Sequence, residues 1–215
     1  MTVTRRSTRA LAGLILVVAA GAATVSAGPA DDAWLIVPGV RVGAITRTAS
    51  ELDLIRAYGH GNVRTQDVNV GEGILERGTV IFPDEPIKRA AVLWKDLSNN
   101  QMPERVQITG SKTLWKTAQG ITLGTSLREL ERLNGRPFVL TGFGWDYGGT
   151  IISWERGALA RAFATGGRII LRLRPPSGLT PGALRSVIGD REFRSNHGTM
   201  QRLNPRAYQL IIEFK

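Results

Sequence analysis

The stretch ITRTASELDLIRAYG, residues 45–59, recurs without a gap as ITLGTSLRELERLNG, residues 121–135. Six positions are identical, and Asp53 is matched by Glu129. Five further residues recur downstream at a shorter offset: Gly71, Gly73, Gly78, Thr79 and Ile81 return as Gly142, Gly144, Gly149, Thr150 and Ile152. The change of offset places extra residues in the first copy, near His60–Gln66. Two similar blocks in the same order predict a duplicated structural unit rather than a catalyst.

Each copy carries the signals of a short helix that follows a short strand. The strands are expected at residues 39–45 and 116–122. Ser50 and Ser126 are good helix N-caps, and the acidic residue three positions later completes a capping box. Gly59 and Gly135 stand where a helix ends on a residue in the left-handed conformation. Helices of about nine residues are unstable alone, so each must pack its apolar side on a sheet.

Runs of β-branched and aromatic residues between glycine turns predict that sheet. Strands are expected at residues 67–70, 79–82, 90–95, 105–109, 137–141, 150–154 and 168–174, with a loop at residues 99–104. Alternation in residues 168–174 predicts that Leu171 and Leu173 face the core, whereas Arg172 and Arg174 face solvent.

The segment that follows Pro175-Pro176 is expected to pack on the same domain. It has signals for a short helix at residues 180–188, a helical turn at residues 195–203 and a closing strand at residues 208–214. The predicted fold class is therefore α+β. It consists of two repeated units, each a short helix plus an antiparallel sheet, with a C-terminal helix and closing strand.

The N-terminal residues are typical of a secretory signal. Three arginines precede an apolar run, and Val25-Ser26-Ala27 fits a small-residue cleavage site. The apolar run is shorter than the ~20 residues of a membrane span. Residues 1–27 are thus predicted to be a signal peptide, which places the mature chain in the periplasm or outside the cell with no transmembrane segment. Units are expected at residues 28–117 and 118–174, followed by a basic segment at residues 175–215.

The positive charge is unevenly distributed. The formal net charge is +10, and three of the arginines lie in the predicted signal peptide. Residues 28–156 are balanced, whereas residues 157–215 hold ten Lys and Arg against Asp190, Glu192 and Glu213. This excess favours contact with an anionic envelope polymer or an acidic protein. The alternative is an arginine-rich composition that simply fills solvent-facing positions.

Several kinds of chemistry are disfavoured by the sequence. Cysteine is absent, so disulfides and thiolate metal sites are excluded. His60 and His197 have no partner at metal-ligand spacing, so neither a metal nor another cofactor is expected. No serine-nucleophile or phosphate-loop motif is present, and no catalytic residue is assigned. Glycoside hydrolysis would need two converging carboxylates, for which the loop residues are Asp96, Asp146 and Glu155.

Part of the chain resembles known bacterial envelope modules. The motif GITLGTS at residues 120–126, with Glu129-Leu130 and LNGRPF at residues 133–138, resembles the small-protein-A type outer-membrane-assembly lipoproteins and the β-lactamase inhibitory protein type. The resemblance implies a helix packed on a small antiparallel sheet, sometimes in tandem, and a role in protein–protein contact. Segments such as 34–39, 142–150 and 203–205 look like a family of exported bacterial proteins with no assigned function.

The loop FGWDYGG at residues 143–149 gives the sharpest functional hypothesis. Trp145 and Tyr147 could form an exposed platform with Asp146 as a polar contact, suited to a protein hot spot or to sugar stacking. The alternative is that these aromatic residues cap the core beside a glycine-rich turn. The predicted binding residues are this trio together with three arginines of the following strand: Trp145, Asp146, Tyr147, Arg168, Arg172 and Arg174.

The sequence thus predicts an exported, non-catalytic binding or assembly protein of the bacterial cell envelope, with a protein partner and no affinity for nucleic acid. Two alternatives stay open. One is an envelope hydrolase for glycan or ester substrates that uses Asp146, Glu155 or His197. The other is a binder of anionic polymer or glycan that uses Arg168, Arg172 and Arg174.

Overall fold

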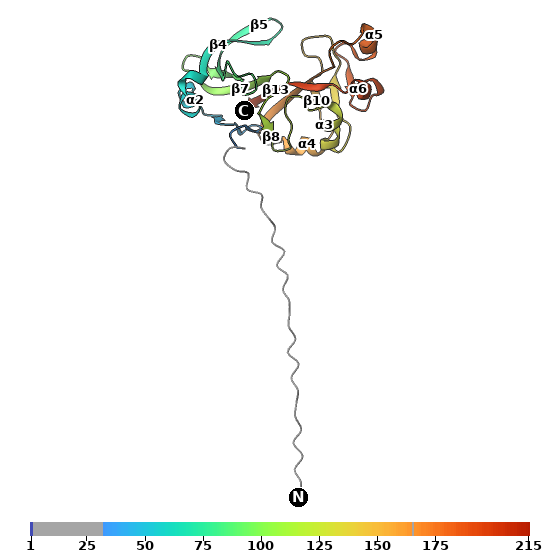
Figure 1. Cartoon of the computed structure of the whole chain (residues 1–215), viewed down its shortest axis with the longest axis horizontal. Helices are drawn as coiled ribbons and strands as arrows, with labels where there is room; N and C mark the ends of the chain where they lie inside the picture. Colours follow the sequence, from blue (N-terminus) through green and yellow to red (C-terminus); the bar gives the residue numbers. More distant parts are fainter. Residues whose placement is uncertain (2–31, 165) are drawn as a thin grey trace.

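A computed structural model describes residue 1, residues 32–164 and residues 166–215 (Figure 1). The largest element is an antiparallel six-stranded sheet in the order β11-β13-β7-β6-β5-β4. Its strands are β4 (Val63–Gly71), β5 (Ile74–Ile81), β6 (Ala90–Asp96), β7 (Gln101–Thr109), β11 (Gly167–Arg174) and β13 (Arg206–Phe214). The predicted signal peptide lies, apart from residue 1, outside the described residues.

Two small sheets and short helices complete the described part of the chain. One sheet has the order β3-β2-β1-β8, with β1 (Leu35–Val37), β2 (Arg41–Val42), β3 (Ile45–Thr46) and β8 (Lys116–Thr117). The other has the order β10-β9-β12, with β9 (Val139–Thr141), β10 (Ile151–Ser153) and β12 (Glu192–Arg194). The helices are α2 (Glu51–Tyr58), α3 (Leu127–Asn134), α4 (Ala158–Ala162), α5 (Pro181–Leu184) and α6 (Gly198–Leu203), with 3₁₀ turns η1 (His60–Asn62) and η2 (Arg185–Val187).

The predicted fold class is wrong. The described part of the chain is mostly β, with 40% of its residues in strands and 20% in helices, in three sheets and five short helices. It is not an α+β arrangement of two helix-plus-sheet units. The first sequence copy continues into β4 and β5 of the large sheet, whereas the second continues into β9 and β10 of a separate three-stranded sheet. The repeated glycines therefore mark turns in different sheet contexts.

The local signals at the two helix starts are confirmed. Ser50 with Asp53, and Ser126 with Glu129, form complete capping boxes. Ser50 also bridges to Gln101 at the start of β7, as Ser126 does to Arg206 at the start of β13. What the two copies share is thus a capped helix start attached to one of two neighbouring central strands.

The helix ends and several strand boundaries differ from the expectation. Gly135 ends α3 in the left-handed conformation, but Gly59 combines a φ of 87° with an extended ψ of 143°. β7 begins at Gln101, inside the stretch expected to be a loop. The strand expected at residues 39–45 is two short strands, β2 and β3. Such short pairings are decided by distant partners rather than by their own residues.

One face of the large sheet packs on the helices and small sheets. Its core side chains include Val106, Ile108, Leu210 and Ile212, which join Leu54 of α2 and Leu127 and Leu130 of α3 in one buried cluster. As predicted, Leu171 and Leu173 face this core. The opposite face carries a smaller cluster of Val68, Val80, Ala91 and Leu93. No helix among the described residues is long and apolar enough to cross a membrane.

Glu51 fastens α2 to the large sheet. Its carboxylate accepts hydrogen bonds from the Thr65 and Thr79 hydroxyls at 2.6 and 2.8 Å and from Asn100 Nδ2 at 2.7 Å. Trp94 Nε1 donates in turn to the Thr79 hydroxyl at 2.9 Å. Burial acts to raise the pKa of Glu51, but these hydrogen bonds together hold the pKa below its ordinary value of 4.5.

Replacing Glu51 should therefore give a pH-dependent loss of stability. In Glu51→Gln, an amide nitrogen, which can only donate, replaces a carboxylate oxygen that accepts hydrogen bonds. We expect this variant to lower the free energy of unfolding at neutral pH by about 2 kcal/mol. Because the folded-state pKa is lowered, the wild-type advantage is present above pH 4.5 and is lost as the pH falls through the folded-state pKa. Urea denaturation across this range checks the prediction. A difference in the free energy of unfolding between the wild type and Glu51→Gln that persists at the lowest pH would contradict it.

Candidate functional site

The loop at residues 143–149 is held at both ends. The carbonyl oxygen of Tyr147 accepts from the hydroxyls of Thr141 and Thr150 at 3.1 and 2.6 Å. The amide of Gly149 donates to the carbonyl of Gly142 at 3.0 Å. Phe143 is buried and bridges to Ile188. The loop is thus a fixed support for the side chains at its tip.

The three aromatic residues of this loop have different environments. Phe143 belongs to the core, whereas Trp145 is 39% exposed. The Trp145 and Tyr147 rings meet edge to face with centroids 5.6 Å apart, and Trp145 Nε1 donates to Gly142 O at 3.2 Å. Tyr147 is half-buried. Of the aromatic residues in this loop, Phe143 is thus the one that packs in the core, whereas the Trp145 ring is exposed to solvent.

Arginines of β11 lie against two of the tyrosines. The Arg172 guanidinium is 4.9 Å from the Tyr147 ring centroid, and that of Arg174 is 4.1 Å from the Tyr208 ring centroid. Both distances fit cation–π attraction, which orients a long, flexible side chain. Arg172 Nη1 also donates to Gln209 Oε1 at 3.0 Å.

Two adjoining pockets open beside these residues. One, of about 300 Å³, is lined by Trp145, Asp146 and Gly148 among others. The other, of about 460 Å³, is lined by Gly124, Pro176, Ser177 and Arg206 among others. Arg174, Pro175 and Tyr208 line both, so the pockets form one groove. We call this the aromatic groove, and it runs from Trp145 past Arg174 to Arg206.

Five of the six predicted binding residues lie in or beside the aromatic groove. They are Trp145, Asp146, Tyr147, Arg172 and Arg174. Arg168 lies at the other end of β11, where its Nη1 is 3.9 Å from Glu213. Tyr208 and Arg206 of β13 were missed, because the sequence does not show that β13 pairs with β11. Alternation in residues 208–214 is the signal that could have drawn attention to Tyr208, whereas Arg206 lies before the strand expected there.

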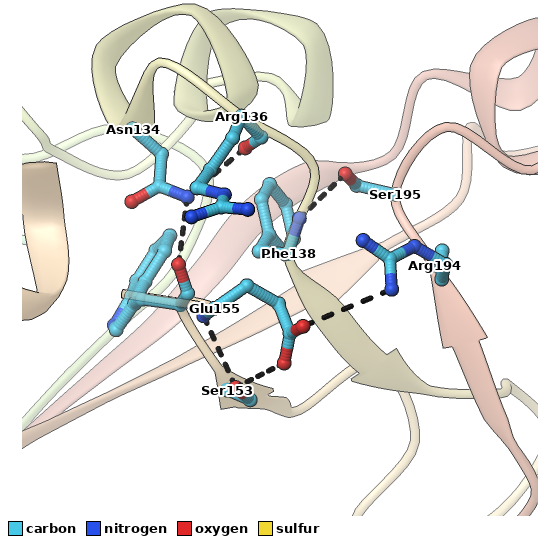
Figure 2. A network of polar contacts seen from close by, with 8 residues as sticks. Asn134, Arg136, Phe138, Ser153, Glu155, Arg194 and Ser195 are labelled. Atoms are coloured by element: carbon cyan, nitrogen blue, oxygen red, sulfur yellow. Dashed lines mark hydrogen bonds and ion pairs between the residues drawn. The ribbon is translucent and has the colours of Figure 1, made fainter. Parts of the chain in front are cut away.

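A second polar cluster surrounds Glu155, in the turn at residues 154–157 (Figure 2). Ser153 Oγ donates to the Glu155 carboxylate at 2.7 Å, and Arg194 approaches it at 3.7 Å. Glu155 and Arg156 both have positive φ, at 52° and 59°, which is unusual for residues with a Cβ. Figure 2 shows the Glu155 carboxylate between Ser153 and Arg194. A pocket of about 290 Å³ there is lined by Arg136, Ser153, Glu155 and Arg156.

The residues named for hydrolysis do not share a pocket in the described structure. Asp146 lines the aromatic groove and Glu155 lines the pocket of Figure 2. His197 lies against Phe193, with ring centroids 5.6 Å apart. Asp96 accepts hydrogen bonds from Asn99 and Ser98 in its own turn, and the Asn99 side chain contributes most to lowering its pKa. Among the described residues, no group of three or more His, Asp or Glu is placed to hold a metal.

No protein family model matches the chain, and neither the curated proteins nor the solved structures contain a significant match to it. The resemblance to envelope modules therefore stays a prediction, and any functional argument has to come from the site itself.

Proposed function

We propose that this chain is an exported bacterial envelope protein that binds an extended, acidic segment of a partner protein in the aromatic groove. The observation that carries the proposal is the exposed Trp145 ring, which shares the groove with an Arg174 side chain stacked on Tyr208. Tryptophan, tyrosine and arginine are the side chains that dominate binding energy at protein interfaces.

The groove suits a carboxylate by charge and by geometry. Tyr208 covers one face of the Arg174 guanidinium, which leaves its in-plane N–H groups available for bidentate binding. Arg206 uses Nη1 to donate to Gly124 O at 2.9 Å. Asp146, the acidic residue of the groove, lies at the Trp145 end. The two arginines therefore favour acidic residues at one end of the bound segment and repel basic ones.

Both alternatives have less support from the described residues. An anionic polymer would be bound best by a row of free arginines along β11, yet Arg172 is engaged by Gln209 and Arg168 lies near Glu213. A hydrolase using Asp146 and Glu155 would need them in one pocket. Export to the periplasm or cell exterior rests on residues 1–27 and is part of the proposal.

Selection from a random peptide library on the purified protein tests this function. We expect the enriched peptides to combine Asp or Glu with large apolar residues. A synthetic copy should bind the wild type, and Trp145→Ala and Arg174→Ala should each weaken binding about tenfold, or about 1.4 kcal/mol.

Leu97→Ala is the matched control, because Leu97 is 64% exposed and lies in the turn at the opposite end of β7 from the groove. It should leave peptide affinity unchanged. Enriched peptides without an acidic bias, or affinities indifferent to Trp145→Ala and Arg174→Ala, would refute the proposed function.

A further inference from the structure

The β4–β5 hairpin leaves the plane of the large sheet. β5 pairs with β6 only from Thr79 to Ile81, whereas its pairing with β4 continues to the tip. The hairpin tip at Gly71 reaches Tyr147, because a Cβ on Gly71 would lie 3.6 Å from the Tyr147 ring. Tyr147 stacks on β11, at the far edge of the sheet order from β4. The hairpin, labelled β4 and β5 in Figure 1, therefore arches over the face that carries Val80 and Leu93.

Two polar contacts hold the arched hairpin. Arg105 Nη2 of β7 donates to both carboxylate oxygens of Glu76 at 3.1 Å, across β6. At the tip, burial raises the pKa of Tyr147, and the negative charge of nearby Glu72 raises it further. The hairpin is thus fixed both at mid-length and at its end.

A pocket of about 460 Å³ lies between the hairpin and the sheet. The hairpin contributes Asn69 and Leu75, and the sheet contributes Gln107 and Gln209. Arg89, the residue before β6, also lines the pocket. The volume falls in the range of small-molecule sites. Gln107 and Gln209 are only 5% and 9% exposed, although glutamine is usually a surface residue.

A chain of hydrogen bonds fixes the orientation of the two glutamines. Arg172 can only donate, so Gln209 must turn Oε1 toward Arg172 Nη1, at 3.0 Å. Gln209 Nε2 then donates to Gln107 Oε1 at 3.4 Å. Consequently the amide nitrogen of Gln107 is the free end of the chain, and no hydrogen bond within the described residues uses it. This nitrogen keeps contact with solvent at the pocket wall, so it is a donor that a ligand in the pocket can use.

The other polar groups of the pocket are also mainly donors. Asn69 Oδ1 already accepts from the amide of Gly71 at 2.9 Å, which leaves Nδ2 as a donor. Arg89 uses Nη1 for Pro83 O at 2.9 Å and keeps its remaining N–H groups and positive charge. Asp67, the acidic residue of the lining, lies 3.6 Å from Arg77. The pocket therefore offers donors and positive charge to a ligand.

We propose that the pocket between the β4–β5 hairpin and the large sheet binds a small organic carboxylate, which accepts from Gln107 Nε2, Asn69 Nδ2 and Arg89. Val68, Leu75 and Ala91 contact the apolar part of the ligand. This site is separate from the aromatic groove and holds whether or not the proposed partner binding is correct.

The test compares D-glucuronate with D-glucose, which differ only in the carboxylate, by following side-chain amide signals in NMR titrations of the purified protein. We expect the Gln107 amide signal, assigned by its loss in Gln107→Glu, to shift with glucuronate at millimolar concentration. Glucose should bind at least about tenfold more weakly. Citrate and L-glutamate extend the test to other carboxylates.

Gln107→Glu is the decisive variant, because it keeps the oxygen that accepts from Gln209 but replaces the free donor with a negative charge. It should abolish carboxylate binding, and Arg89→Gln should weaken it about tenfold. Gln119→Glu, in the turn after β8, is the control and should leave binding unchanged. Absence of a Gln107 shift with all three carboxylates, or binding unaffected by Gln107→Glu in a folded variant, would overturn the proposal.

Discussion

Gly149→Ala should lower the free energy of unfolding by about 3 kcal/mol, since it combines strain at positive φ with overpacking. Gly149 has a φ of 74°, and an added Cβ would lie far inside contact distance of the Leu173 carbonyl oxygen. This is backbone of β11, which cannot rotate away as a side chain can. The loop would have to leave β11, which would separate Tyr147 from Arg172. Urea denaturation measures the loss.

Gly135→Ala is the matched control for this effect. Gly135 also has a φ of 74°, but nothing lies within 4 Å of its added Cβ. The control thus isolates the conformational strain, which should cost about 1 kcal/mol. Equal losses in the two variants would mean that the close approach of the loop to β11 does not contribute.

Asn134→Ala should cost about 3 kcal/mol, because it leaves several buried backbone groups without partners. Asn134 is 1% exposed, and its Nδ2 donates to the carbonyls of Arg136 and Trp154 at 3.0 and 2.9 Å (Figure 2). Its Oδ1 accepts from the amide of Leu159 at 3.2 Å. The one side chain thereby ties the end of α3 to the turn of Glu155 and to the start of α4.

Thermal and urea unfolding of Asn134→Ala, compared with Asn196→Ala, checks this prediction. Asn196 is exposed, so its replacement should change the free energy of unfolding by less than about 0.5 kcal/mol. If the two variants unfold alike, the turn at residues 154–157 is held by other contacts than Asn134.

Local features of the fold could be predicted from the sequence because neighbouring residues determine them. The capping boxes at Ser50 and Ser126 are examples, and so is the alternation of Leu171 with Arg172. The pairing of strands that are far apart in the sequence could not be predicted in this way. The strand-pairing of β7 with β13 joins residues about a hundred positions apart, and a period of two fixes the face of a residue but not its neighbouring strand. The prediction of the fold class was wrong for this reason.

The candidate site likewise combines residues that the local sequence identifies with residues that only strand pairing brings together. Trp145, Asp146 and Tyr147 were found because glycines on both sides mark an exposed loop. Tyr208 lies beside Arg174 only because β13 pairs with β11, where the register shifts between Arg172 and Leu173. The pocket under the hairpin depends on the residues of β5 before Thr79 not pairing with β6, and nothing in the hairpin sequence predicts this.

Site-specific photocrosslinking in the cells that make the protein tests the central claim most directly. A benzophenone amino acid replaces Trp145 in the aromatic groove or, as the control, Leu97 at the other end of β7. We predict a discrete protein adduct from position 145 alone, with a crosslinked peptide rich in Asp and Glu, and loss of that adduct when Arg174→Glu is added. Adducts equally abundant from both positions, or an adduct at position 145 that survives Arg174→Glu, would contradict binding of an acidic partner segment in the aromatic groove.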